Sequence, residues 1–117
     1  MKIKEIVALL NADILACEDK LESDVHSACG SDMMSDVLAF VKDQAVLLTG
    51  LVNTQVIRTA DMMDMRCVVF VRNKKPTEEM LALAKESGIV VLASSFRMYE
   101  ACGVLYSKGL CSPRSIS

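Results

Sequence analysis

Three short apolar runs at regular spacing constrain the fold of this chain more than any other feature. They are AVLLTG at 45–50, RCVVFV at 66–71 and IVVLAS at 89–94. Such compact runs suit strands that are buried on both faces. Helical patterns at 53–65 and 76–88 separate them, and strands that alternate with helices over short links indicate βαβ units. We therefore expect an α/β fold: a single-domain, mostly parallel sheet flanked by helices.

Capping residues mark where the helices begin and end. Pro76 suits the first turn of the helix at 76–88, Glu78 and Glu79 lie near the positive end of its dipole, and Gly88 ends it. A final helix is expected over 96–109. The expected N-caps of the other two helices are Asn53 or Thr54 and Ser94 or Ser95.

The first forty residues predict two more helices and two more strands. Apolar spacing in 3–10 indicates an amphipathic helix, and short strands are expected at 13–17 and 24–30 around a charged loop. Ser31 and Asp32 are interpreted as the cap of a helix over about 32–41. Its expected buried face consists of Met33, Met34, Val37, Leu38 and Phe40.

Length, charge and hydropathy exclude several classes of protein. A chain of 117 residues makes one domain, which we expect over 1–111, with a polar tail at 112–117. It is 52% hydrophobic but only 4% aromatic, so the core must be aliphatic and rich in thioethers. A net charge of −2 argues against nucleic-acid binding. No apolar run approaches the ~20 residues that span a bilayer, so no membrane segment is expected.

The cysteines and the N-terminus predict a cytoplasmic protein. Five cysteines, without a C-x-x-C pair, fit neither a disulfide framework nor a structural zinc site, so reduced and mostly buried thiols are expected. Glu5, Asn11 and Asp13 interrupt the N-terminal apolar patch, which argues against a signal peptide. His26, the single histidine, is interpreted as a strand side chain rather than a ligand.

Polar residues gather in the loops expected at the carboxyl edge of the sheet, where α/β proteins bind ligands. Helix N-termini at this edge favour anions, so a phosphate or nucleotide could bind there. The alternative is that the hydroxyl and amide residues only cap helices and the basic loop is only solvated. The candidate ligand-binding residues are Asp32, Ser35, Thr49, Asn53, Thr54, Arg72, Lys74, Lys75, Ser94 and Ser95.

Neither catalysis nor a metal site is predicted. A nucleophile needs an adjacent base held by a third group, and His26 lies on the wrong segment for these loops. Asp32 and Asp36 are four residues apart and could bind a hard cation, but capping is the favoured interpretation, because the helix dipole favours carboxylates at a helix N-terminus. Ser35 and Asp36 are expected to support the neighbouring loop or a dimer contact. No catalytic residue, metal ligand or cofactor is assigned.

Five methionines near the ends of the expected helices suggest two uses. Methionine fills gaps in a core and also suits adaptable contact surfaces. An apolar domain of this kind is expected to bury part of its surface in a partner, most simply a second copy of itself. The residues concerned are Met33, Met34, Met62, Met63 and Met65.

Taken together, the segment order and five motifs resemble the DRTGG domain, which is related to the N-terminal domain of bacterial HPr kinase/phosphorylase. The resemblance covers nearly the whole chain. The motifs are IKEIVALLNADILAC, GSDMMSDVL, LLTG before a helix, RNKKPTEEMLALAKESGIVVLAS and FRMYEACGVLYSKG.

The resemblance implies a bacterial regulatory or assembly module, since such domains accompany phosphotransacetylase domains, CBS-containing pyrophosphatases and the kinase itself. Stand-alone versions also occur, some beside iron-only hydrogenase genes. The kinase's P-loop domain has no counterpart here. Where relatives tend to carry Asp-Arg this chain has LVNTQV, and where they carry Thr-Gly-Gly it has VRNKK. Side chains thus replace two glycines that would let a ligand approach the backbone.

Two functions follow as hypotheses. The first is a non-catalytic, dimerising regulatory module that senses a small anionic metabolite or nucleotide at the loop edge. The second is a pure protein–protein interaction domain that controls a metabolic or redox enzyme, such as a hydrogenase-linked one. A third, an independent phosphotransfer or hydrolytic enzyme, lacks candidate groups.

Overall fold

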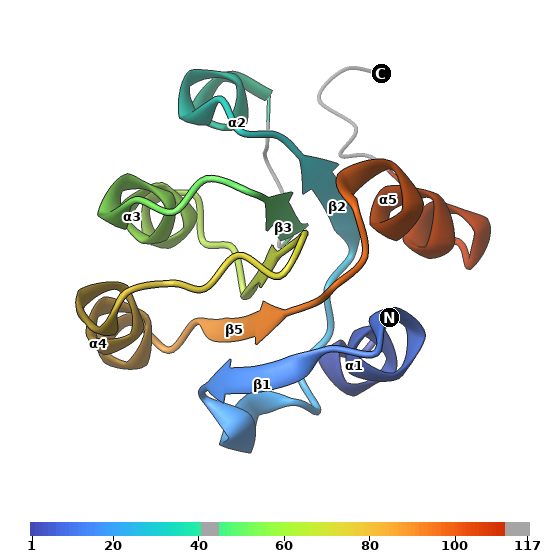
Figure 1. Ribbon diagram of the computed structural model, residues 1–117, viewed down its shortest axis with the longest axis horizontal. Coiled ribbons are helices and arrows are strands. Elements are labelled where there is room, and N and C mark those ends of the chain that lie inside the picture. Colours follow the sequence, from blue (N-terminus) through green and yellow to red (C-terminus); the bar gives the residue numbers. More distant parts are fainter. Residues whose placement is uncertain (41–44, 112–117) are drawn as a thin grey trace.

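The computed structural model describes residues 1–40 and 45–111, and it shows a five-stranded sheet between two sets of helices (Figure 1). The strand order is β1-β5-β4-β3-β2; β2 to β5 are parallel, and β1 pairs antiparallel with β5. This confirms the predicted α/β fold. The elements are α1 Ile3–Leu10, β1 Asp13–Ala16, a 3₁₀ turn Glu18–Lys20, β2 Ser27–Gly30, α2 Met34–Phe40, β3 Ala45–Thr49, α3 Thr54–Met62, β4 Cys67–Phe70, α4 Glu78–Ser87, β5 Val90–Ala93 and α5 Met98–Ser107.

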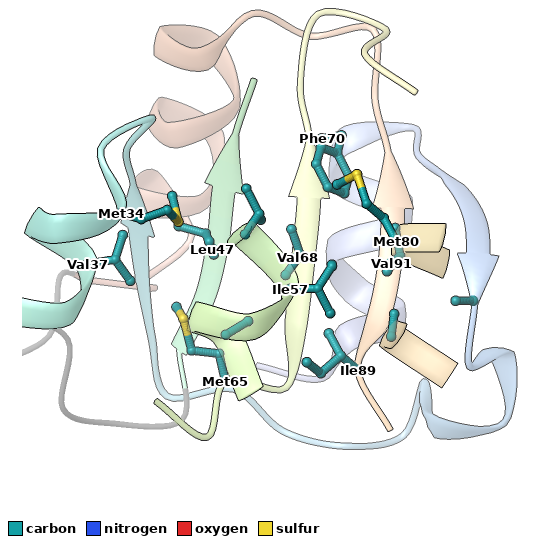
Figure 2. Close-up of a cluster of buried hydrophobic side chains, with 14 of the residues drawn as sticks. Met34, Val37, Leu47, Ile57, Met65, Val68, Phe70, Met80, Ile89 and Val91 are labelled. Atoms are coloured by element: carbon teal, nitrogen blue, oxygen red, sulfur yellow. The ribbon is translucent and has the colours of Figure 1, made fainter. Parts of the chain in front are cut away.

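Helices α2, α3 and α4 cover one face of the sheet (Figure 1). Alternate strand residues point toward them because successive side chains of a strand face opposite sides. Val68 of the central strand β4 and its neighbour Val91 of β5 lie side by side on this face. Phe70 and Met80 are fully buried in the same cluster (Figure 2). The cluster is aliphatic and thioether-rich, as the composition predicted.

Helices α1 and α5 cover the opposite face (Figure 1). The parallel connections through α2, α3 and α4 all lie on the first face, and α5 then crosses to the second, where it packs over β2 and β3 beside α1. Ile3, Ile6 and Leu10 of α1 and Leu105 of α5 are fully buried there. Both faces of the sheet are therefore covered, which explains why strands β3, β4 and β5 are apolar apart from Thr49 at the end of β3.

Two boundaries in the first forty residues differ from the prediction. The second strand starts at Ser27 rather than at Asp24, because Asp24 makes only an isolated bridge with Lys2. His26 is therefore exposed and outside the strand, which corrects the interpretation of this histidine. The second boundary is the start of α2, which lies at Met34 rather than at about residue 32. The predicted helix end at residue 41 and the tail at 112–117 lie outside the described residues.

The predicted buried face of α2 is only partly right. Met34 and Val37, three residues apart, face the sheet, whereas Met33 is 60% exposed and Leu38 is 39% exposed. A helix of seven residues presents a narrow stripe to the sheet, and neighbouring positions lie off that stripe. The side chain of Phe40 lies outside the described part.

The predicted N-cap of α3 and the predicted end of α4 are present, whereas the N-cap of α4 was not predicted. Asn53 accepts a hydrogen bond from the backbone N–H of Gln55 at 2.8 Å. Thr77 caps α4 by accepting from Met80 N–H at 3.2 Å, so Pro76 precedes the cap instead of lying in the first turn. Gly88 ends α4 with φ +74°, a left-handed conformation that glycine adopts without steric cost.

All five cysteines are free thiols, but only Cys67 is buried, so the prediction of mostly buried thiols is wrong. Cys17, Cys29 and Cys102 are half-buried, and Cys111 is exposed. The complete burial of Cys67 strongly raises the pKa of its thiol, which suppresses the reactive thiolate.

Thiol labelling tests this arrangement. With iodoacetamide at pH 8, Cys111 is expected to react first and Cys67 only after the chain unfolds, because reaction needs both access and a thiolate. Peptide mass spectrometry over time measures each site, and a sample in urea serves as the control. Labelling of Cys67 at the rate of Cys111 in the folded protein would contradict the packing described above.

Candidate functional site

Three loops at the carboxyl edge of the parallel strands enclose an open cleft of about 880 Å³. They follow β2, β4 and β5. The volume lies within the roughly 300–1,000 Å³ typical of small-molecule sites. Two guanidinium groups and one carboxylate supply its charge. The lining residues are Gly30, Ser31, Asp32, Arg72, Asn73, Ser95, Arg97, Met98 and Tyr99.

Asp32 connects the first loop to the end of strand β3. Its Oδ1 accepts hydrogen bonds from the Gly50 N–H at 2.8 Å and from the Thr49 hydroxyl at 2.9 Å. These bonds, above all the one from the Gly50 backbone, lower the pKa of the Asp32 carboxyl and hold it ionised. The prediction that Asp32 caps its own helix is therefore wrong. Ser31 makes the local turn instead, since its hydroxyl accepts from Met33 N–H at 2.9 Å.

Arg72 lies beside Asp32 on an unusual backbone. Arg72 and Asn73 are both left-handed, with φ +59° and +58°, which is uncommon for residues with side chains. Their N–H groups donate to Phe96 O at 2.8 Å and Ser94 O at 3.0 Å, which ties the β4 loop to the β5 loop. The guanidinium then lies over Gly50, where a Cβ would collide with it, and Nη2 is 3.9 Å from Asp32 Oδ2.

The start of α5 forms the third wall. Its N-cap position is Arg97, which makes no side-chain capping bond, so the expectation that Ser94 or Ser95 caps this helix is wrong. The Ser94 hydroxyl is buried and donates to Leu10 O at 2.8 Å. Gly30, at the end of β2, lets α5 pack closely against that strand, because a Cβ there would lie 2.6 Å from Cys102 Sγ and 3.2 Å from Met98 Sδ.

The structure brings together only part of the candidate set. Asp32, Arg72 and Ser95 line the cleft, and the Thr49 hydroxyl donates a hydrogen bond to Asp32. Asn53 is engaged in capping, and Ser94 bonds inside the fold. The remaining candidates, which lie outside the cleft lining, are Ser35, Thr54, Lys74 and Lys75.

Six of the nine lining residues were not among the candidates, and three of these six carry large polar side chains. Asn73, Arg97 and Tyr99 reach the cleft from the β4 loop and the start of α5. Asn73 sits inside RNKK, so its loop was identified although the residue was not. Arg97 and Tyr99 follow Ser95, and their place depends on where α5 begins. The sequence gives no signal that α5 begins at Met98, with Arg97 rather than Ser94 or Ser95 at its N-cap position.

No metal centre is found among residues 1–40 and 45–111, where no three histidine, cysteine or acidic side chains gather. Asp32 precedes α2 and its Oδ1 is engaged by Thr49 and Gly50, so it does not share a helix face with Asp36. In the same described ranges, no helix is long and apolar enough to cross a bilayer.

The hydrogen bonds of Asp32 predict a pH effect on stability. Because the pKa of this carboxyl is lower in the folded state, its contribution is present above roughly pH 4 and is lost as the pH falls below that value. The side chain is 51% exposed, so solvent screening limits the effect to about 1 kcal/mol. Between pH 5 and pH 2.5, wild-type Tm is expected to fall more steeply than that of Asp32→Asn.

Asp36→Asn is the matched control for this prediction. It removes an exposed carboxylate that makes no hydrogen bond within the described part of the chain, and it should keep the wild-type profile. If Tm falls equally steeply between pH 5 and pH 2.5 in wild type and in Asp32→Asn, the ionised Asp32 carboxylate does not stabilise the fold.

The fold and the cleft define a class: a three-layer α/β/α domain with a charged cleft at the carboxyl edge of its sheet. The family model named DRTGG domain matches residues 5–106, so the chain belongs to the DRTGG domain family. This confirms the resemblance that the motifs predicted.

A solved structure shares the fold. It contains the CBS and DRTGG domains of the regulatory region of Clostridium perfringens pyrophosphatase, complexed with the activator diadenosine tetraphosphate. The TM-score is 0.72 at 12% sequence identity, and the match covers 99% of this chain and 52% of that one. This chain thus spans about half the length of that structure. No curated protein matches this chain.

Proposed function

We propose that this chain is a non-catalytic regulatory module that binds a nucleotide or another small anion in the cleft formed by the β2, β4 and β5 loops. One observation carries the proposal: Arg72 and Arg97, from different loops, line a single cleft of nucleotide size. Guanidinium groups bind phosphate through paired, charge-assisted hydrogen bonds.

The local backbone supports an anion at this position. The amino end of α5 borders the cleft and has no side-chain cap, so its first N–H groups and the helix dipole favour negative charge. The N–H groups of Arg72 and Asn73 are already bonded to the β5 loop. The anion is therefore bound by side chains and by the N–H groups at the start of α5. In a glycine-rich loop, by contrast, the N–H groups of the loop itself would bind it.

The family membership supports a regulatory role, since the solved relative is a regulatory region with a nucleotide activator. We further propose a bacterial, cytoplasmic homodimer. The free thiols suit a reducing compartment, and exposed apolar side chains leave surface for a second copy.

A thermal-shift and calorimetry screen tests the proposal. The probes are AMP, ADP, ATP and inorganic pyrophosphate. At 100 times Kd a ligand adds about 2.7 kcal/mol to folded-state stability, which a Tm shift detects. Arg97→Gln should reduce the shift, whereas Arg58→Gln, an exposed arginine of α3, should not. Light scattering should give twice the chain mass of 12.8 kDa. A monomer that no probe stabilises would overturn the proposal.

A second candidate function is a pure protein-interaction domain that controls a metabolic or redox enzyme. It is favoured by Met33, Met62, Tyr99 and Tyr106, all of which are at least 60% exposed. In that case, replacing Arg72, Lys74 and Lys75 together with glutamine leaves partner binding intact, and Tyr106→Ser weakens it. A large loss from the triple variant would count against this candidate.

A further inference from the structure

The two carboxylate oxygens of Asp32 have different environments. Oδ1 accepts from both Thr49 and Gly50, which fixes the orientation of the carboxylate. Among the described residues, none donates a hydrogen bond to Oδ2: Arg72 Nη2 is 3.9 Å away, too far for a direct hydrogen bond. Asp32 lines the cleft, so the cleft has a fixed, ionised acceptor with one oxygen that receives no hydrogen bond from the described residues.

This acceptor restricts the anions that the cleft can take. A bare phosphate or pyrophosphate has no donor to offer at pH 7 beyond its residual protons, and its charge is repelled by the carboxylate. A ligand that carries hydroxyl groups beside its phosphates satisfies the arginines and the carboxylate together. In dinucleotide-binding α/β folds, an aspartate or glutamate near the carboxyl edge of the sheet accepts a hydrogen bond from a ribose hydroxyl.

Resting on the function proposed above, we infer that Asp32 is a specificity residue: the cleft takes a ribonucleotide whose ribose hydroxyls donate to Asp32 Oδ2 while its phosphates bind Arg72 and Arg97. Tyr99 supports this ligand class, because it lines the cleft, is 92% exposed and carries an aromatic ring on which a base can stack.

Calorimetry with three probes tests the inference. ADP carries both the hydroxyls and the phosphates, 2′,3′-dideoxy-ADP lacks the hydroxyls, and inorganic pyrophosphate lacks the nucleoside. Wild type is expected to bind ADP about tenfold or more tightly than dideoxy-ADP, since an unpaired polar group at a site penalises the analogue. Asp32→Asn should lower that ratio to about threefold or less and should bind pyrophosphate more tightly than wild type does.

Two variants keep the test interpretable. Asp32→Asn retains an oxygen that can accept from Gly50 and Thr49, so it is expected to fold. Thr49→Val removes one support of the carboxylate but leaves the carboxylate itself, and it should keep a preference for ADP over dideoxy-ADP.

The outcomes separate the inference from the proposed function. If pyrophosphate binds as tightly as ADP and the two nucleotides bind alike, the anion site stands and the inference about Asp32 is wrong. An ADP preference that survives unchanged in Asp32→Asn also overturns it. If none of the three probes binds, both the proposed function and the inference fall.

Discussion

Phe70→Ala is expected to lower the free energy of unfolding by about 3–5 kcal/mol, the range for large-to-small changes in a core. Phe70 is fully buried on β4, in the middle of the sheet, and packs in the cluster with Val68, Met80 and Val91 (Figure 2). No other aromatic residue belongs to this cluster among the described residues, so its loss leaves a cavity that small aliphatic neighbours cannot fill. Urea unfolding followed by circular dichroism measures the change.

The matched control for this prediction is Met62→Ala. Met62 is 70% exposed at the end of α3, so its truncation should change stability by about 0.5 kcal/mol or less. A loss below about 1 kcal/mol in Phe70→Ala, with an unchanged m-value, would contradict the core described here.

Gly50→Ala is expected to weaken ADP binding by about tenfold or more while changing Tm little, because a charge-assisted contact contributes about 1.5–3 kcal/mol. The added methyl group would take the place of the Arg72 guanidinium. That group is the flexible end of a half-exposed side chain, so it can move away at small cost to the fold. It would then leave its position beside Asp32. Calorimetry with ADP and a thermal melt measure the two effects.

Gly103→Ala is the matched control for Gly50→Ala. A Cβ at Gly103 meets nothing within 4 Å, and alanine in the middle of α5 should raise stability by about 0.5–1 kcal/mol without altering ADP affinity. Gly50→Ala that binds ADP as tightly as wild type would show that the position of Arg72 over Gly50 is unimportant for binding.

The fold was largely predictable because its strongest signals are local. The apolar runs at 45–50 and 66–71 became β3 and β4 with boundaries shifted by one residue. Asn53 caps the beginning of α3 and Gly88 ends α4, as their chemistry predicts. Where the signal was weak, at β2 and α2, the prediction placed the boundaries two or three residues too early.

The cleft was predictable only in part. The sequence indicated the edge of the sheet and three lining residues, Asp32, Arg72 and Ser95. It did not indicate that the Asp32 carboxylate turns away from its own helix toward Gly50, since that bond joins residues eighteen positions apart. Arg97 was missed because the link after β5 looked like a capped helix start, whereas the Ser94 hydroxyl bonds to α1 instead.

By itself, the sequence determined the layers of this protein, because periodic burial and capping act over a few residues and need no knowledge of distant partners. The tertiary structure alone decided which charged side chains share the cleft. Three loops from separate parts of the chain meet there, and hydrogen bonds between them, not any one local pattern, set the positions of Asp32 and Arg72.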